Sequence, residues 1–171
     1  MGIGELLGTY DIVHLFGPVD MQTAQTGKRV LVETAACVTI VVHKAAGTAG
    51  DDPTFDVQQA DAASGGTIKD LDKVDHYYLK AEATLDADEA WAKKTQTAAS
   101  EIVDPGGATT SAEEEQILVI EIDPATLDIA NGFKYISLNC ADTGTNAQLG
   151  SALAYLRMAY AAPPASLPAT Q

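Results

Sequence analysis

The feature that most limits the fold of this chain is a series of short β-rich runs separated by turn-rich connections. The clearest run, Ala36 to Lys44, reads A-C-V-T-I-V-V-H-K. In a strand, Val38, Ile40 and Val42 would form a purely apolar side that packs on a core. Two glycines, two aspartates and a proline then break the run. We expect the following run, Thr54 to Gln59, to return as the second strand of a hairpin with a long loop.

Runs of the same kind recur along the chain. They are Thr9–Phe16, Arg29–Glu33, Val74–Ala81, Trp91–Thr97, Gln116–Ile122, Phe133–Ala141 and Ala147–Ala162. The run at 116–122 is the most hydrophobic and predicts a central strand. The run at 147–162 has enough alanine and leucine for a helix, but Gly150, Tyr155 and Tyr160 favour a strand. Asp123 and Pro124 suit the cap and first position of a helical turn.

This pattern predicts an all-β fold: an antiparallel β-sandwich, jelly-roll-like, of about eight short strands. With 171 residues, the chain suits one domain. We expect that domain to occupy residues 1–160, with an N-terminal arm over about residues 1–8, followed by a proline-rich C-terminal tail at 161–171. The sequence shows neither a signal peptide nor a membrane-spanning run, which predicts synthesis in the cytoplasm.

The net charge of −14, from 24 acidic and 10 basic residues, restricts the partners. Nucleic acids and anionic membranes are bound by clustered lysine and arginine, so neither is an expected partner. An acidic surface is suited to docking on basic protein surfaces. Cys37 and Cys140 lie in apolar runs and are interpreted as buried free thiols, with a cross-strand disulfide left open as the alternative.

No catalytic, cofactor or metal signature emerges. His14, His43 and His76 each lie in a strand-like run, with no spacing that brings them together around a metal. The acidic runs at 51–52, 86–89 and 113–115 lack the spaced ligands and glycine of a calcium loop, and we interpret them as solvated loop charges. We therefore expect no catalytic residue, no cofactor, no metal and no enzymatic activity.

Several segments resemble a family of small virion proteins from tailed bacteriophages and prophages. The segments that carry the resemblance are 38–44, 46–53, 57–60, 95–99, 111–114, 118–123, 127–128, 131–133 and 146–150. They span roughly residues 19 to 160, and they are strand and turn motifs that name no active site. The resemblance implies a non-enzymatic virion structural protein, foremost a capsid decoration, minor head or cement protein bound to the major capsid protein on the virion surface.

The resemblance also implies a homo-oligomer, and a trimer would match the local three-fold positions of a capsid. Apolar residues near the start, Ile3, Leu6, Leu7 and Tyr10, are candidates for an arm that contacts a partner, although they would equally suit the first strand and the core.

Two alternatives stay open. One is a tail, connector or fibre-associated virion protein with the same fold class. The other is a carbohydrate-binding β-sandwich, for which Trp91, Tyr77 and Tyr78 are the candidate stacking residues. For these aromatic side chains we expect mostly packing roles.

Overall fold

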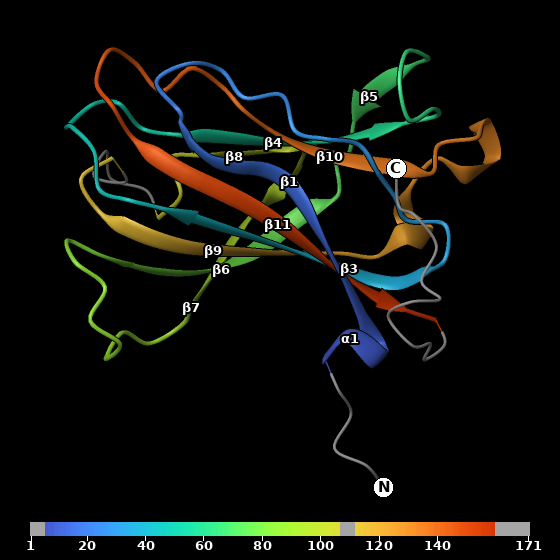
Figure 1. Cartoon of the computed structure of the whole chain (residues 1–171), viewed down its shortest axis with the longest axis horizontal. Coiled ribbons are helices and arrows are strands. Elements are labelled where there is room, and N and C mark those ends of the chain that lie inside the picture. Colours follow the sequence, from blue (N-terminus) through green and yellow to red (C-terminus); the bar gives the residue numbers. More distant parts are fainter. Residues whose placement is uncertain (1–5, 107–111, 160–171) are drawn as a thin grey trace, which may run out of the picture.

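The computed structural model describes residues 6–106 and 112–159 and is a sandwich of two antiparallel β-sheets (Figure 1). Its elements, in chain order, are α1 (Leu6–Thr9), β1 (Tyr10–Asp20), β2 (Val30–Leu31), β3 (Ala35–Lys44), β4 (Thr54–Ala60), β5 (Ile68–Asp70), β6 (Val74–Glu82), β7 (Ala92–Ala99), β8 (Glu101–Val103), β9 (Glu115–Ile122), η1 (Pro124–Thr126), η2 (Ile129–Asn131), β10 (Tyr135–Cys140) and β11 (Leu149–Met158).

One sheet has six strands in the order β1-β11-β3-β9-β6-β7. The second has five strands, in the order β2-β10-β4-β5, with the short β8 also paired to β4. The all-β sandwich expected from the sequence is therefore confirmed, and its jelly-roll-like connectivity stays a prediction. The expected proline-rich tail at 161–171 lies outside the described residues.

The core fills the space between the sheets with aliphatic side chains. Val38, Ile40 and Val42 of β3 are at most 1% exposed, as their alternation predicts. Phe55 and Val57 of β4 are buried opposite them in the other sheet. The burial of these apolar side chains drives the association of the two sheets, at roughly 25 cal/mol for each Å² of apolar surface removed from water.

The expected hairpin between the runs at 36–44 and 54–59 is wrong. Strand β3 lies between β11 and β9 in the six-stranded sheet, whereas β4 pairs with β10, β5 and β8 in the other sheet. The intervening residues 45–53 therefore cross from one sheet to the other. The glycines, aspartates and proline mark where the chain turns, but they do not determine which strand becomes its hydrogen-bonding partner.

Other expectations hold. Strand β9 is central, between β3 and β6, and β11 is paired along both edges, which confirms a strand rather than a helix in this region. The Asp123 carboxylate accepts a hydrogen bond of 2.9 Å from the amide of Ala125, so the predicted helical turn is confirmed as the 3₁₀ turn η1. The sequence missed β5 and β8, which have three residues each and form beside β4.

Candidate interaction surface

A row of paired residues crosses all six strands on the outer face of the larger sheet. Its members, from β1 to β7, are His14, Leu153, Val41, Val119, Tyr78 and Lys93. The four inner members are apolar or aromatic and partly exposed, and the histidine and the lysine stand at the two ends. An antiparallel sheet with one face in water normally alternates apolar and polar side chains, so this row departs from the pattern of a solvated face.

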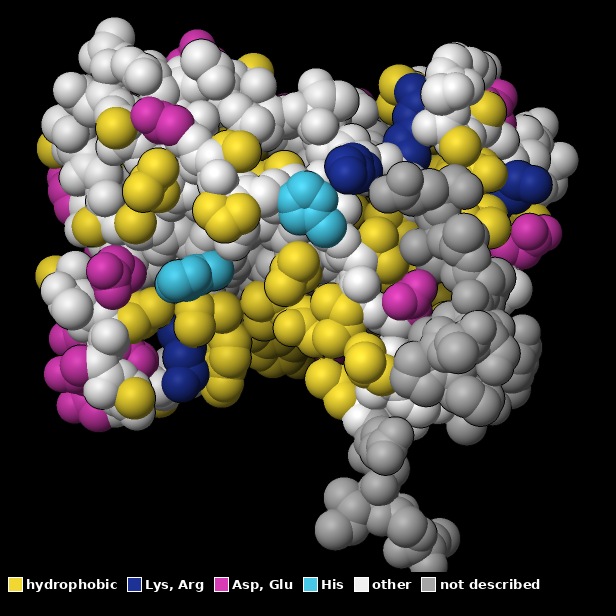
Figure 2. All heavy atoms as spheres, in the orientation of Figure 1, with side chains coloured by type: hydrophobic (Ala, Val, Ile, Leu, Met, Phe, Trp, Pro, Cys, Tyr) yellow, Lys and Arg dark blue, Asp and Glu magenta, His cyan; other side chains and the backbone are white. Residues whose placement is uncertain are grey.

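The adjacent rows extend the same surface. On one side Ile12, Tyr155, Thr39 and Glu121 are successive partners, and on the other side Ser151, His43, Ile117 and Lys80 are. We call the partly exposed set Ile12, Val41, Tyr78, Ile117, Val119, Leu153 and Tyr155 the apolar face. Figure 2 shows hydrophobic side chains gathered in a recess below the centre of the view, over the six-stranded sheet. Contiguous exposed apolar patches of this kind mark sites of protein contact.

The outer face of the five-stranded sheet has the opposite character. Its outward positions include Asp56, Gln58 and Asn139, and the Asn139 amide donates a hydrogen bond of 2.8 Å to the Gln58 side-chain oxygen. Asp70 and Glu101 add charge on the neighbouring short strands, opposite Gln58 and Asp56. The outward positions of this sheet are mostly polar, with Ile68 and Val103 as exposed apolar residues on its short strands. A row of apolar outward residues on successive strands therefore distinguishes the six-stranded sheet.

An aromatic corner lies at the β6–β7 end of the apolar face. The Trp91 side chain is 51% exposed, and with Tyr78 and Val119 it lines a shallow hollow of about 310 Å³. The Lys80 ammonium lies 5.3 Å from the centre of the Trp91 ring, and the Lys93 ammonium lies 5.8 Å from that of Tyr78. These distances are within the range of cation–π attraction.

The expected packing roles are divided among the three aromatic residues. Tyr77 is 7% exposed and packs in the core, as predicted. Trp91 does not, because it precedes the edge strand β7 and its ring lies beside the Lys80 side chain on the surface.

The predicted N-terminal contact residues lie at one edge of the same sheet. Leu6 and Leu7 belong to α1, which has no buried residue, and they are 54% and 44% exposed. Tyr10 begins β1 and pairs with Arg157 of β11. Figure 1 shows α1 projecting from the sandwich at the N-terminal end of β1. Ile3 lies outside the described residues, and a partner-contact role for Leu6, Leu7 and Tyr10 stays a prediction.

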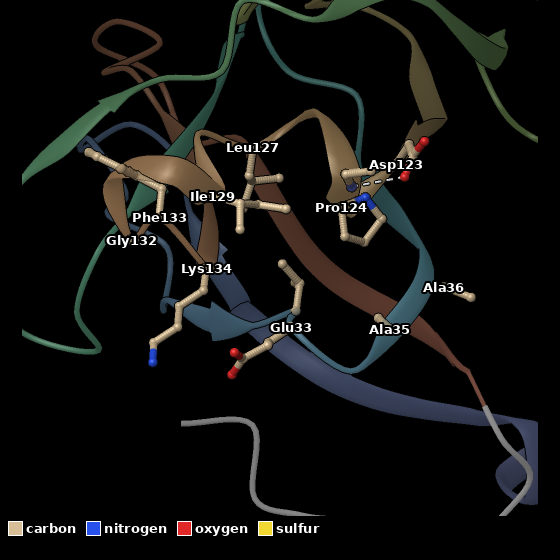
Figure 3. Close-up of a pocket in the computed structure, with 12 residues that line it drawn as sticks. Glu33, Ala35, Ala36, Asp123, Pro124, Leu127, Ile129, Gly132, Phe133 and Lys134 are labelled. Atoms are coloured by element: carbon tan, nitrogen blue, oxygen red, sulfur yellow. Dashed lines mark hydrogen bonds between the residues drawn. The ribbon is translucent and has the colours of Figure 1, made fainter.

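A pocket of about 610 Å³ lies at one end of the sandwich (Figure 3). Its walls are largely apolar and include Leu127, Ile129 and Phe133, while Glu33 and Lys134 contribute the charged side chains nearby. The Asp123 carboxylate at this pocket is engaged in capping η1. The pocket therefore offers an apolar recess without converging polar groups for catalysis among its lining residues.

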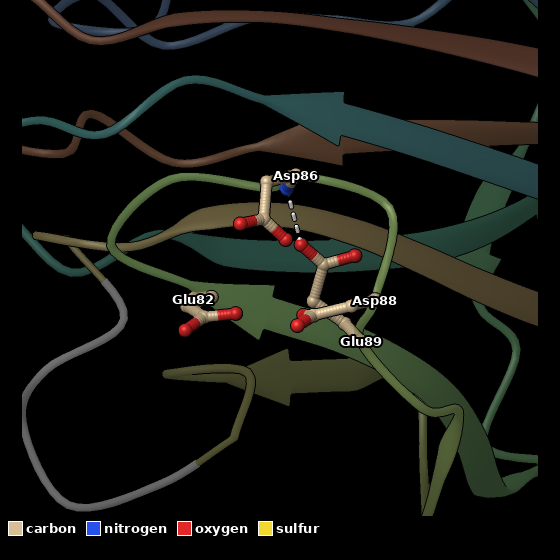
Figure 4. Close-up of side chains that lie close together, drawn as sticks. All are labelled: Glu82, Asp86, Asp88 and Glu89. Atoms are coloured by element: carbon tan, nitrogen blue, oxygen red, sulfur yellow. Dashed lines mark hydrogen bonds between the residues drawn. The ribbon is translucent and has the colours of Figure 1, made fainter.

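Four carboxylates gather where β6 runs into the connection to β7 (Figure 4). Glu82, Asp86, Asp88 and Glu89 place their oxygens within 4.8 Å of one another. Loss of surrounding water and then the charges of Asp88 and Asp86 raise the pKa of Glu82 above its usual range. Oxygen ligands of this type suit a hard cation such as Ca²⁺, but most of these side chains are exposed, which equally fits the solvated charges expected from the sequence.

The three histidines lie on different strands, β1, β3 and β6. His14 and His43 are exposed and the His76 ring contacts Asp75 at 2.6 Å. Among residues 6–106 and 112–159, the group of side chains close enough to share a metal consists of carboxylates alone.

Both cysteines are free thiols. Burial raises the pKa of Cys140 to about 12. The expectation of a buried thiol is wrong for Cys37, which is partly exposed because it lies near the start of β3 on the outward side, opposite Arg157.

A buried lysine is the main feature that the sequence did not indicate. Lys44 ends β3 and is 1% exposed. Its ammonium donates hydrogen bonds to the carbonyl oxygens of Ala45, Ala112 and Glu114, at 3.1, 3.4 and 2.5 Å. Burial lowers the pKa of Lys44 to about 8, against the opposing effect of Glu114 and other nearby acids. These hydrogen bonds connect the end of β3 to the segment that precedes β9. In the sequence, the one sign of this burial is that Lys44 has the same parity in the strand as the inward residue Val42.

No family model, curated protein or solved structure matches this chain. Within the described residues, none of the helices has the length and apolar character needed to cross a membrane.

Proposed function

We propose that this chain is a non-enzymatic structural protein of a bacteriophage particle: a capsid decoration protein that binds the major capsid lattice in many copies and associates with itself. The observation that carries the proposal is the apolar face, because a broad apolar surface on the outside of a complete sandwich indicates a protein built to be covered by other protein. The sequence resemblance to small phage virion proteins is the reason for proposing a bacteriophage particle as the assembly that contains this chain.

The contact with the capsid is assigned to the N-terminal segment. Leu6 and Leu7 are 54% and 44% exposed, and α1, which has no buried residue, holds them away from the core of their own chain. A short apolar arm that projects from a rigid domain is suited to insertion between subunits of a preassembled shell. The acidic surface adds attraction to a basic shell, so raised salt is expected to loosen the contact.

The experiment that tests this function locates the chain on virus particles produced from a genome that encodes it. Cryo-electron microscopy is expected to show many symmetric copies on the outer shell. A few copies at the tail or the connector would favour the alternative role of a tail, connector or fibre-associated protein. Absence from purified particles would overturn a structural role.

A binding assay with particles that lack the chain tests the arm. The double variant Leu6→Asp, Leu7→Asp is expected to lose binding to the shell, while Ile68→Asp, which changes an equally exposed residue on β5 of the other sheet, retains it. Equal binding by both variants would contradict the assignment of the arm.

A second candidate function rests on the aromatic corner. An exposed tryptophan beside a shallow hollow, with a lysine next to its ring, is suited to stack on a sugar ring, which is how a carbohydrate-binding β-sandwich would act. A glycan array probed with the wild-type chain and with Trp91→Ala tests it. Binding that disappears in the variant supports a glycan module, and absence of binding by the wild type removes this candidate.

A further inference from the structure

We infer that two copies of this chain pair face to face through the apolar face of the six-stranded sheet. The inference deepens the self-association included in the proposed function and names the surface and the number of copies. Its basis is the row His14, Leu153, Val41, Val119, Tyr78 and Lys93, whose inner members are uncharged across four successive strands.

Charge favours a second copy as the occupant. The chain carries 14 net negative charges, so most surfaces of two copies repel each other. In the three rows that contain the apolar face, Glu121 is the single acidic side chain, whereas Lys80 and Lys93 are basic. Two copies can therefore meet here without placing carboxylates against carboxylates.

The outer face of the smaller sheet is unsuited to such pairing. It presents Asp56, Asp70 and Glu101, and the polar Gln58 and Asn139 side chains already bond to each other. Burial of these groups would leave carboxylates without water, at a cost that few new contacts offset.

The three rows that contain the apolar face are large enough for a dimer interface. Six strands spaced by about 4.8 Å and three rows of outward residues cover about 500 Å² on each copy. A pair would bury about 1,000 Å² in total, which is the lower limit for a specific interface.

The geometry favours two copies over three. A single self-complementary face generates a two-fold axis, because the same residues contact each other from both sides. A three-fold ring requires two different patches on each copy, one for each neighbour. The apolar face is one continuous surface that crosses the sheet, so we assign the chain a two-fold dimer in place of the trimer expected from capsid symmetry.

Sedimentation velocity of the purified full chain over a wide range of concentrations tests the inference. The wild type is expected to sediment as a dimer. Val41→Glu, at the centre of the apolar face, is expected to raise the dissociation constant at least about 100-fold, as the loss of a central interface residue does. The matched control is Val103→Glu: Val103 is 63% exposed on β8 of the other sheet, and its variant is expected to remain dimeric.

A second variant guards against misfolding. Thr39→Arg introduces a charge beside Tyr155 on the same face, where a long aliphatic stem can lie along the sheet. Circular dichroism and the melting temperature report whether each variant keeps the fold. A wild type that is monomeric or trimeric, or a dimer that folded Val41→Glu and Thr39→Arg leave intact, overturns the inference.

The outcome is separable from the proposed function. A dimer in solution that is absent from virus particles overturns decoration and leaves the pairing standing. A monomer that is present in many copies on the shell overturns the pairing and leaves decoration standing.

Discussion

The ammonium of Lys44 lies 2.5 Å from the carbonyl oxygen of Glu114, so a lysine at the end of one strand holds the segment that leads into the neighbouring strand. Because this ammonium is buried, its pKa is lowered to about 8 from 10.5. The unfolded chain therefore binds more protons than the folded chain between these two values. Stability consequently rises with pH in this window.

We expect the free energy of unfolding to gain about 1 kcal/mol from Lys44 between pH 8 and 9. Lys44→Met removes this gain, since methionine has a similar length and does not titrate. Urea unfolding of both proteins at the two pH values measures the difference. A pH dependence that is the same in the variant would contradict a lowered pKa for Lys44.

Cys140 contributes the opposite slope at higher pH. Its pKa is raised to about 12 by burial, from 9.0, so above pH 9 the unfolded chain loses this proton first and stability falls. Between pH 9 and 10 this falling contribution opposes the rise from Lys44, so Cys140→Ala is expected to make stability rise more steeply with pH there than in the wild type, with an overall loss of stability from the small cavity. Cys37→Ala, which changes the partly exposed thiol, is the control and should keep the slope.

Gly27 is a position where any side chain collides with backbone. An added Cβ would lie 2.0 Å from the carbonyl oxygen of Leu138 in β10. We expect Gly27→Ala to lower the free energy of unfolding by at least about 2 kcal/mol, because the segment must move away from the sheet. Thr26→Ala, at the exposed neighbouring residue, should change it by less than about 0.5 kcal/mol. Equal melting temperatures for the two variants would rule out the close approach.

The carboxylate cluster at the start of the β6–β7 connection is expected to oppose folding at neutral pH. The pKa of Glu82 is raised, so its ionisation removes stability as the pH rises through that value. Glu82→Gln should therefore raise the melting temperature at pH 7, and added salt should reduce the gain by screening. Glu101→Gln, which neutralises an exposed carboxylate on β8, is the comparison. A gain that does not depend on salt would point to another cause.

Lys80 and Trp91 should be weakly coupled. At 5.3 Å from the ring centre and partly in water, the ammonium is expected to contribute about 0.5 kcal/mol through the ring. A double-mutant cycle with Lys80→Met and Trp91→Ala measures this coupling from urea unfolding. A cycle with Lys80→Met and Trp91→Phe should give a smaller coupling energy, since a phenyl ring keeps part of the attraction to the cation.

The sequence by itself determined most of the longer strands and, for β3, the side that faces the core. Alternation in β3 predicted the buried positions Val38, Ile40 and Val42 correctly, because a strand has a fixed two-residue period. The cap of η1 was also predictable, since Asp123 and Pro124 act on adjacent backbone.

Only the tertiary structure decided which strands are neighbours. β3 pairs with β11 and β9, which are distant in sequence, and the hairpin with β4 that local turn signals suggested does not form. The pairing of strands depends on packing between residues that are distant in sequence, so a local sequence pattern does not predict it. For the same reason Lys44 became buried and Trp91 exposed. The apolar face exists only because the outward residues of six separate strands align in register across one sheet.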